Sequence, residues 1–80
     1  MIATGQRELV LYGTIGCHLC ELAEQQLLPC VTAGWQIELV DIADDEQLLA
    51  RYALSIPVLR HSASATELTW PFDTDSISRF

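Results

Sequence analysis

Hydrophobic and polar positions along the chain follow two different periods, and their alternation predicts the secondary structure. Residues 8–12 are apolar on both sides of a pleat, as in a central strand with both faces covered. After a glycine-flanked break at residues 13–16, apolar side chains recur at helical spacing at Leu19, Leu22, Ala23 and Leu27. Pro29 predicts the end of that helix, because proline lacks a backbone donor and restricts the residue before it.

The middle of the chain repeats this order with a second strand and a second helix. Residues 35–40 alternate between apolar and polar side chains and run into Asp41-Ile42, which predicts a strand. Asp44 and Gln47 have the form of a helix N-cap and its reciprocal partner. That helix is expected to end near Ala53 or Leu54, and its apolar face consists of Leu48, Leu49 and Tyr52.

The last third of the chain predicts two short strands and one short helix. Residues 56–61 and 66–70 are separated by only four small or polar residues, which favours a hairpin. Asp73 is a candidate cap for a final helix, in which Ile77 and Phe80 lie one turn apart on the same face. The predicted order is therefore βαβαββα.

These connections define the fold class. A strand-helix-strand unit makes the first two strands parallel with a right-handed crossover, and the tight hairpin makes the last two antiparallel. The sequence therefore predicts an α/β fold of the thioredoxin kind, with a mixed four-stranded sheet flanked by helices. At 80 residues, the chain is expected to form a single domain, residues 1–80.

Composition and charge narrow the classes of partner. Half of the residues are hydrophobic, but no apolar run approaches the roughly 18 residues of a membrane span. Residues 1–8 lack the basic start and apolar core of an export signal, so we expect a soluble, cytoplasmic protein that binds no membrane. The net charge is −7, lysine is absent and the four arginines are scattered, which argues against nucleic acid as a partner.

Cys17-His18-Leu19-Cys20 is the clearest candidate for chemistry. Cys17 lies where a strand passes into a helix, and the backbone N–H groups and positive dipole there favour a thiolate. We therefore expect Cys17 to have a lowered pKa and to act as the nucleophile. Cys20, one turn further on, is the predicted resolving thiol. His18 is either a cation that stabilises the thiolate or an exposed residue of the first turn.

Two other interpretations of the cysteines stay open. A C-x-x-C pair is also half of a common zinc site, and the chain offers Cys30, His18 and His61 as further ligands, although there is no second C-x-x-C. The pair could also be plain packing. Cys30 lies about ten residues beyond Cys20, or roughly 15 Å along a helix, so it is read as a small buried filler rather than a redox partner.

Ser55-Ile56-Pro57 before the third strand is the second signal. Proline removes a ladder donor and therefore belongs at a strand start or an edge. With the cysteine pair after the first strand, this segment resembles the corresponding one in glutaredoxins, within the thioredoxin superfamily. More closely, the chain resembles short bacterial glutaredoxin-like proteins, and this likeness includes the segment Trp70-Pro71-Phe72-Asp73.

The resemblance implies a substrate site. In such a protein Pro57 is cis and stands against the cysteines, and the backbone of Ile56 pairs with an extended substrate or with glutathione. Asp73 with Thr74 would stand in for the acid that meets the γ-glutamyl end of glutathione. The basic residue expected three positions before the first cysteine is replaced by Thr14. Arg51 could meet the other carboxylate, but an exposed helix arginine is the favoured interpretation.

The sequence thus predicts a thiol-disulfide oxidoreductase that uses a Cys17–Cys20 couple in cell redox homeostasis. Its expected partners are protein or low-molecular-weight disulfides, with no bound cofactor or metal and with glutathione as a candidate co-substrate. The alternative is a non-catalytic thioredoxin-fold module that uses the same cysteines to bind a partner or a metal. Gly16 and Leu11 stand where thioredoxins have tryptophan and a buried acid, which argues against a true thioredoxin.

Overall fold

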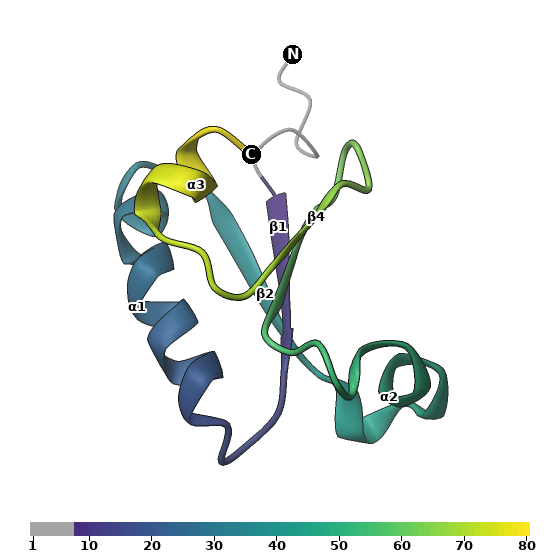
Figure 1. The fold of residues 1–80 in the computed structure, drawn as a ribbon. Helices are drawn as coiled ribbons and strands as arrows, with labels where there is room; N and C mark the ends of the chain where they lie inside the picture. The colour runs from purple at the N-terminus through teal and green to yellow at the C-terminus, as the bar shows by residue number, and fades with distance from the viewer. Residues whose placement is uncertain (1–7) are drawn as a thin grey trace.

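A computed structural model describes residues 8–80, and the expectation about an export signal in the first residues lies outside that range. The strands are β1 (Glu8–Gly13), β2 (Gln36–Asp41), β3 (Val58–His61) and β4 (Glu67–Thr69). The helices are α1 (His18–Thr32), α2 (Glu46–Tyr52) and α3 (Thr74–Ser78), with a short 3-10 helix, η2 (Ile42–Asp44), before α2. This is the predicted βαβαββα order (Figure 1).

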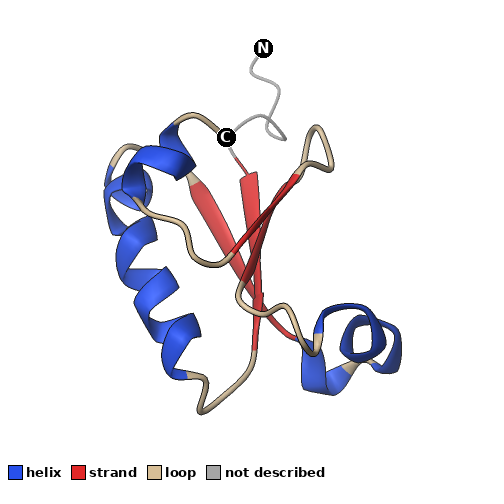
Figure 2. Ribbon diagram, viewed as in Figure 1, coloured by secondary structure: helices blue, strands red, loops and turns tan. Residues whose placement is uncertain are grey.

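The strands form one mixed sheet in the order β2-β1-β3-β4. β1 pairs parallel with β2 and antiparallel with β3, and β4 pairs antiparallel with β3. The helices lie beside this sheet, with α1 and α3 on one side of it and α2 on the other (Figure 2). The predicted fold class, an α/β fold with a mixed four-stranded sheet flanked by helices, is confirmed.

The two faces of β1 bury two separate clusters, as the apolar pattern of that strand predicts. Leu9 and Leu11 point towards α1 and α3, whereas Val10 and Tyr12 point towards α2. The larger cluster consists of Leu9, Leu11, Ala23, Leu27, Leu59, Phe72 and Ile77. The smaller consists of Tyr12, Ile42, Tyr52 and Val58. β1 is thus the central strand that holds the two layers together.

Helix α1 differs from the prediction in its end and in its buried stripe. Pro29 lies inside the helix, which continues to Thr32. An interior proline costs one hydrogen bond and a steric clash, and the packing of Cys30 against the larger cluster offsets this cost. Leu19 is 44% exposed, and Cys20 takes its place in the buried stripe with Ala23 and Leu27. The stripe therefore begins at the second cysteine.

The helix that follows β2 begins one residue later than predicted. Asp45, rather than Asp44, caps α2, and its Oδ1 accepts hydrogen bonds from the backbone N–H groups of Gln47 and Leu48. The strand before it ends at Asp41, which caps the 3-10 helix by accepting from Ala43 N at 2.9 Å. Ile42 therefore leaves the strand. Leu49, placed on the apolar face by its spacing, is 43% exposed.

The hairpin of β3 and β4 is present, although both strands are shorter than predicted. β3 starts at Val58, since Pro57 has no donor and Ile56 N donates back to Tyr52 O at 3.1 Å. Asp73 caps α3 as predicted, but the helix ends at Ser78 and Phe80 follows it, packed against the core. Across residues 8–80 there is no helix with the length and apolar character needed to cross a membrane.

Candidate redox site

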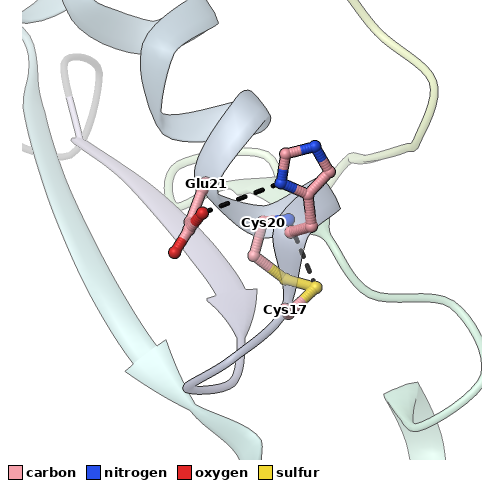
Figure 3. The surroundings of a disulfide bond; sticks show 4 residues. Cys17, Cys20 and Glu21 are labelled. Atoms are coloured by element: carbon pink, nitrogen blue, oxygen red, sulfur yellow. Dashed lines mark hydrogen bonds and ion pairs between the residues drawn. A yellow bond between two sulfur atoms is a disulfide. The ribbon is translucent and has the colours of Figure 1, made fainter.

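The two cysteines are joined in a disulfide at the start of α1, with their Cα atoms 5.2 Å apart (Figure 3). Cys17 is the N-cap residue, and its Sγ accepts a hydrogen bond from Cys20 N at 3.2 Å. Because the cap sulfur receives a backbone donor of the first turn, a negative charge on that sulfur in the dithiol form would be stabilised there. The predicted strand-to-helix position of Cys17 is therefore observed.

The two sulfur-bearing residues differ in their access to solvent. Cys17 is partly exposed, whereas Cys20 is only 5% exposed and belongs to the buried stripe of α1. A substrate can therefore reach Cys17 more easily than Cys20. This difference supports unequal roles, with the first cysteine as nucleophile and the second as resolving thiol.

Gly13 and Gly16 shape the turn that presents the cysteines. A Cβ at Gly13 would lie 2.9 Å from Cys20 Sγ, so the end of β1 approaches the disulfide at a distance that only glycine permits. Gly16 has a φ of +81°, which side-chain-bearing residues rarely adopt. The sequence marked both residues as a break, but the contact with Cys20 depends on tertiary packing and had no local signal.

His18 lies on the exposed side of the first turn. Its Nδ1 is 3.8 Å from Glu21 Oε2, an ion pair that Figure 3 marks with a dashed line to Glu21. Both side chains are largely exposed. The sequence did not single out Glu21 as a partner of His18. A positive charge on the imidazole would therefore be partly offset by the Glu21 carboxylate, which limits its effect on a Cys17 thiolate.

Ile56 and Pro57 lie immediately before β3, the strand that pairs with β1. The Ile56-Pro57 peptide bond is cis, and the Pro57 side chain is fully buried. Tyr12 pairs with Val58, so one step further along these antiparallel strands Pro57 lies opposite Gly13, the residue that contacts Cys20. The backbone N–H of Ile56 is already bonded to Tyr52 O. Its substrate-pairing role stays a prediction.

Asp73 and Thr74 serve the packing of α3. The Asp73 carboxylate accepts from Ser76 N and Ser76 Oγ, both at 2.8 Å, and these hydrogen bonds lower the pKa of its carboxyl group. Thr74 N donates to Gln26 Oε1 at 3.1 Å, and Thr74 Oγ1 donates to Gln26 O at 3.2 Å. Both side chains therefore have structural partners, and their predicted contact with glutathione stays a prediction.

Arg51 and Cys30 both have structural contacts with neighbouring residues. Arg51 lies over the Tyr52 ring and within 3.9 Å of Glu67, as an exposed helix arginine would. Cys30 is partly buried against the larger cluster, and this burial raises the pKa of its thiol. Within residues 8–80, no group of three or more His, Cys, Asp or Glu side chains is arranged to hold a metal ion.

A cavity of about 360 Å³ opens beside the disulfide, between the start of α1 and the end of β2. It is lined by both cysteines, by apolar side chains that include Ile15 and Leu39, and by three acids, Glu21, Glu24 and Asp41. These acids come from two separate elements, α1 and the end of β2. The spacing along the chain did not reveal that they share one cavity.

A C-x-x-C disulfide at the start of the first helix, on a mixed four-stranded sheet with a cis-proline before β3, defines a thioredoxin-like protein. The sequence profile of the glutaredoxin-like domain (DUF836) matches residues 8–80. The chain therefore belongs to that glutaredoxin-like family, and its cysteine pair indicates a redox type of function. Curated protein sequences contain no match.

Two solved proteins are similar over most of their length. The crystal structure of protein XcR50 from X. campestris has 37% sequence identity and a TM-score of 0.77, covering 89% of this chain and 91% of that one. The solution structure of protein Ne2328 from Nitrosomonas europaea has 32% identity and a TM-score of 0.78, covering 99% of this chain and 93% of that one. The fold class is thus shared by experimentally determined relatives.

Proposed function

We propose that this protein is a thiol-disulfide oxidoreductase of the cytoplasm that reduces protein or low-molecular-weight disulfides through its Cys17–Cys20 couple. The observation that carries the proposal is the pair itself. Cys17 caps α1 and is accessible, and Cys20 lies buried one turn below it. Such a pair is suited to accepting a mixed disulfide at one sulfur and resolving it with the other.

The reaction starts from the dithiol form. The thiolate of Cys17 attacks one sulfur of the substrate disulfide, and the second substrate sulfur leaves as a thiolate and takes up a proton. Cys20, after losing its proton, then attacks the Cys17 sulfur of the mixed disulfide. This step forms the Cys17–Cys20 disulfide and releases the first substrate sulfur as a thiol. Two electrons pass from the protein to the substrate, and a cellular dithiol or glutathione must return them.

The backbone hydrogen bond to Cys17 Sγ and the helix dipole supply the electrostatic support for the attacking thiolate. The buried position of Cys20 keeps the resolving thiol away from competing disulfides. Pro57, buried beside Gly13, is the proposed floor against which an extended substrate strand would lie, with Ile56 beside it.

Single-turnover reduction by the prereduced protein tests the proposal without any added reductant. The substrates are an insulin-type protein disulfide and a glutathione mixed disulfide of a small peptide. Cys17→Ser should abolish reduction, and Cys20→Ser should accumulate a mixed disulfide on Cys17 that mass spectrometry detects. Cys30→Ser, which removes a thiol away from the pair, is the matched control and should leave the rate unchanged. The proposal is wrong if the wild-type protein reduces neither substrate.

A further inference from the structure

The cavity beside the disulfide has a strongly one-sided charge. Its acids are Glu21, Glu24 and Asp41, and no basic side chain is found among the described residues that line it. The Glu24 side chain has no hydrogen-bond or ion-pair partner within residues 8–80, and Asp41 uses one oxygen to cap the 3-10 helix. Glu21 is only loosely paired with His18 at 3.8 Å. The carboxylates therefore remain available to a ligand.

The arginines of the described chain are engaged or placed elsewhere. Arg51 pairs with Glu67, Arg60 lies in β3 beside Tyr12 on the face towards α2, and Arg79 follows α3. Since the whole chain also carries a net charge of −7, the potential at the mouth of the cavity is negative. An anionic thiol compound such as glutathione would be repelled from this side of the disulfide.

The cavity also offers apolar contact next to its carboxylates. Ile15 is 91% exposed and Leu39 is 58% exposed, although both side chains are large and hydrophobic. Exposed apolar side chains grouped around a reactive centre are typical of a surface that binds a polypeptide. Here they lie within the same cavity as Cys17 and Cys20, so that a chain bound against them would bring its own disulfide to Cys17.

We propose that the preferred substrate is a disulfide in a cationic polypeptide segment, with a basic residue close to the cysteine and an apolar residue next to it. This inference rests on the proposed oxidoreductase function and names its substrate class. The basic side chain binds among Glu21, Glu24 and Asp41, and the apolar one packs on Ile15 and Leu39. Bond making and electron transfer follow the dithiol reaction described above, with the substrate disulfide as the electron acceptor.

Two synthetic peptides test this substrate class. Each contains one intramolecular disulfide and one leucine beside a cysteine, and they differ only in having either arginine or glutamate at the flanking positions. The second-order rate constant for reduction by the prereduced protein is measured for each at low and high salt. We expect the arginine peptide to react at least about tenfold faster at low salt, since more than one carboxylate contributes. The ratio should fall towards one near 1 M salt, where the Debye length is about 3 Å.

Matched variants show whether the acidic cavity causes the difference in rate between the two peptides. Glu24→Gln should lower the ratio of the two rates about two- to fivefold, the size of one exposed ion pair. Glu21→Gln with Glu24→Gln should lower it further. Glu8→Gln, at the opposite end of β1, removes the same charge and should leave the ratio unchanged. The ratio isolates recognition, because any change in the reactivity of Cys17 affects both peptides equally.

The possible failures are distinct. Equal rates for the two peptides, or a ratio that Glu8→Gln changes as much as Glu24→Gln does, would overturn the cationic-substrate inference while leaving the oxidoreductase function in place. If neither peptide and neither substrate named under the proposed function is reduced, the oxidoreductase function itself is wrong. A faster reaction of the glutamate peptide would reverse the assignment.

Discussion

Gly13→Ala is the most direct test of how the sheet holds the disulfide. The added methyl group would lie 2.9 Å from Cys20 Sγ and 3.2 Å from Cys20 Cβ, which is closer than packed atoms allow. Cys20 is 5% exposed and is held by the disulfide, so it has little room to move. Gly13 is the last residue of β1, and alanine can adopt the backbone conformation of a strand.

The magnitude follows from two opposing effects. Overpacking of one methyl group in a tight core costs about 1–3 kcal/mol. Replacing glycine by alanine at a compatible backbone position restores about 0.4–1 kcal/mol by restricting the unfolded chain. We therefore expect Gly13→Ala to lower the free energy of unfolding of the oxidised protein by about 1–2 kcal/mol.

Urea unfolding followed by circular dichroism, in both redox forms, measures this effect. In the dithiol form Cys20 Sγ can rotate away from Gly13, so we expect the loss to be about 1 kcal/mol smaller there. By the thermodynamic cycle, such a difference raises the reduction potential of the couple by about 20 mV, since 1.4 kcal/mol corresponds to about 30 mV for two electrons. A redox titration checks this second number independently.

Gly16→Ala is the matched control for this experiment. A Cβ at Gly16 has no neighbour within 4 Å, but the φ of +81° costs alanine about 1–2 kcal/mol. We expect this loss to be nearly equal in the two redox forms, because it comes from the backbone. The reasoning about Gly13 is refuted if Gly13→Ala leaves the oxidised protein as stable as the wild type, or destabilises both forms equally.

Two further predictions concern contacts away from the cysteines. Thr74→Val removes the hydroxyl that donates to Gln26 and should lower the free energy of unfolding by about 0.5–1.5 kcal/mol in urea. Burial and the hydrogen bond to Glu67 raise the pKa of Tyr52 from 10.0 to about 12, so ultraviolet titration should show that Tyr52 ionises late. Glu67→Gln should shift this ionisation to lower pH. Since the folded state favours the neutral phenol, this contribution of about 2–3 kcal/mol is complete below pH 10 and is lost between about pH 10 and 12, which alkaline urea titrations measure.

The parts of the fold predicted from sequence are those that local patterns determine. The two-sided apolar run of β1 correctly indicated a central strand, and the short link between β3 and β4 correctly indicated a hairpin. The predicted helix end at Pro29 was wrong, because a proline ends a helix only when the residues after it gain no stability from remaining helical. Here Cys30 packs against the core, and this contact between distant segments outweighs the local signal.

Only the part of the candidate site that lies within the C-x-x-C motif could be predicted from the sequence. Cys17 and Cys20 are three residues apart, so the motif alone determines that they share one turn. The acidic cavity depends on the parallel pairing of β1 with β2, which brings Asp41 beside Gly13 and thereby beside α1. The sequence predicts that these two strands are parallel, but not which residues pair. Spacing along one chain segment therefore reveals the nucleophile but not the surface that selects its substrate.

Glu21 connects the reactivity of Cys17 with its selectivity for substrates. It lies in the first turn of α1, where a negative charge interacts favourably with the same helix dipole that stabilises a thiolate at Cys17. The negative charge of Glu21 also repels the Cys17 thiolate directly. A protonated His18, whose Nδ1 is 3.8 Å from Glu21 Oε2, offsets part of this repulsion. Removing Glu21 should therefore make Cys17 more reactive while weakening attraction for a cationic substrate. A single rate would mix these two effects, whereas the ratio for oppositely charged peptides separates them.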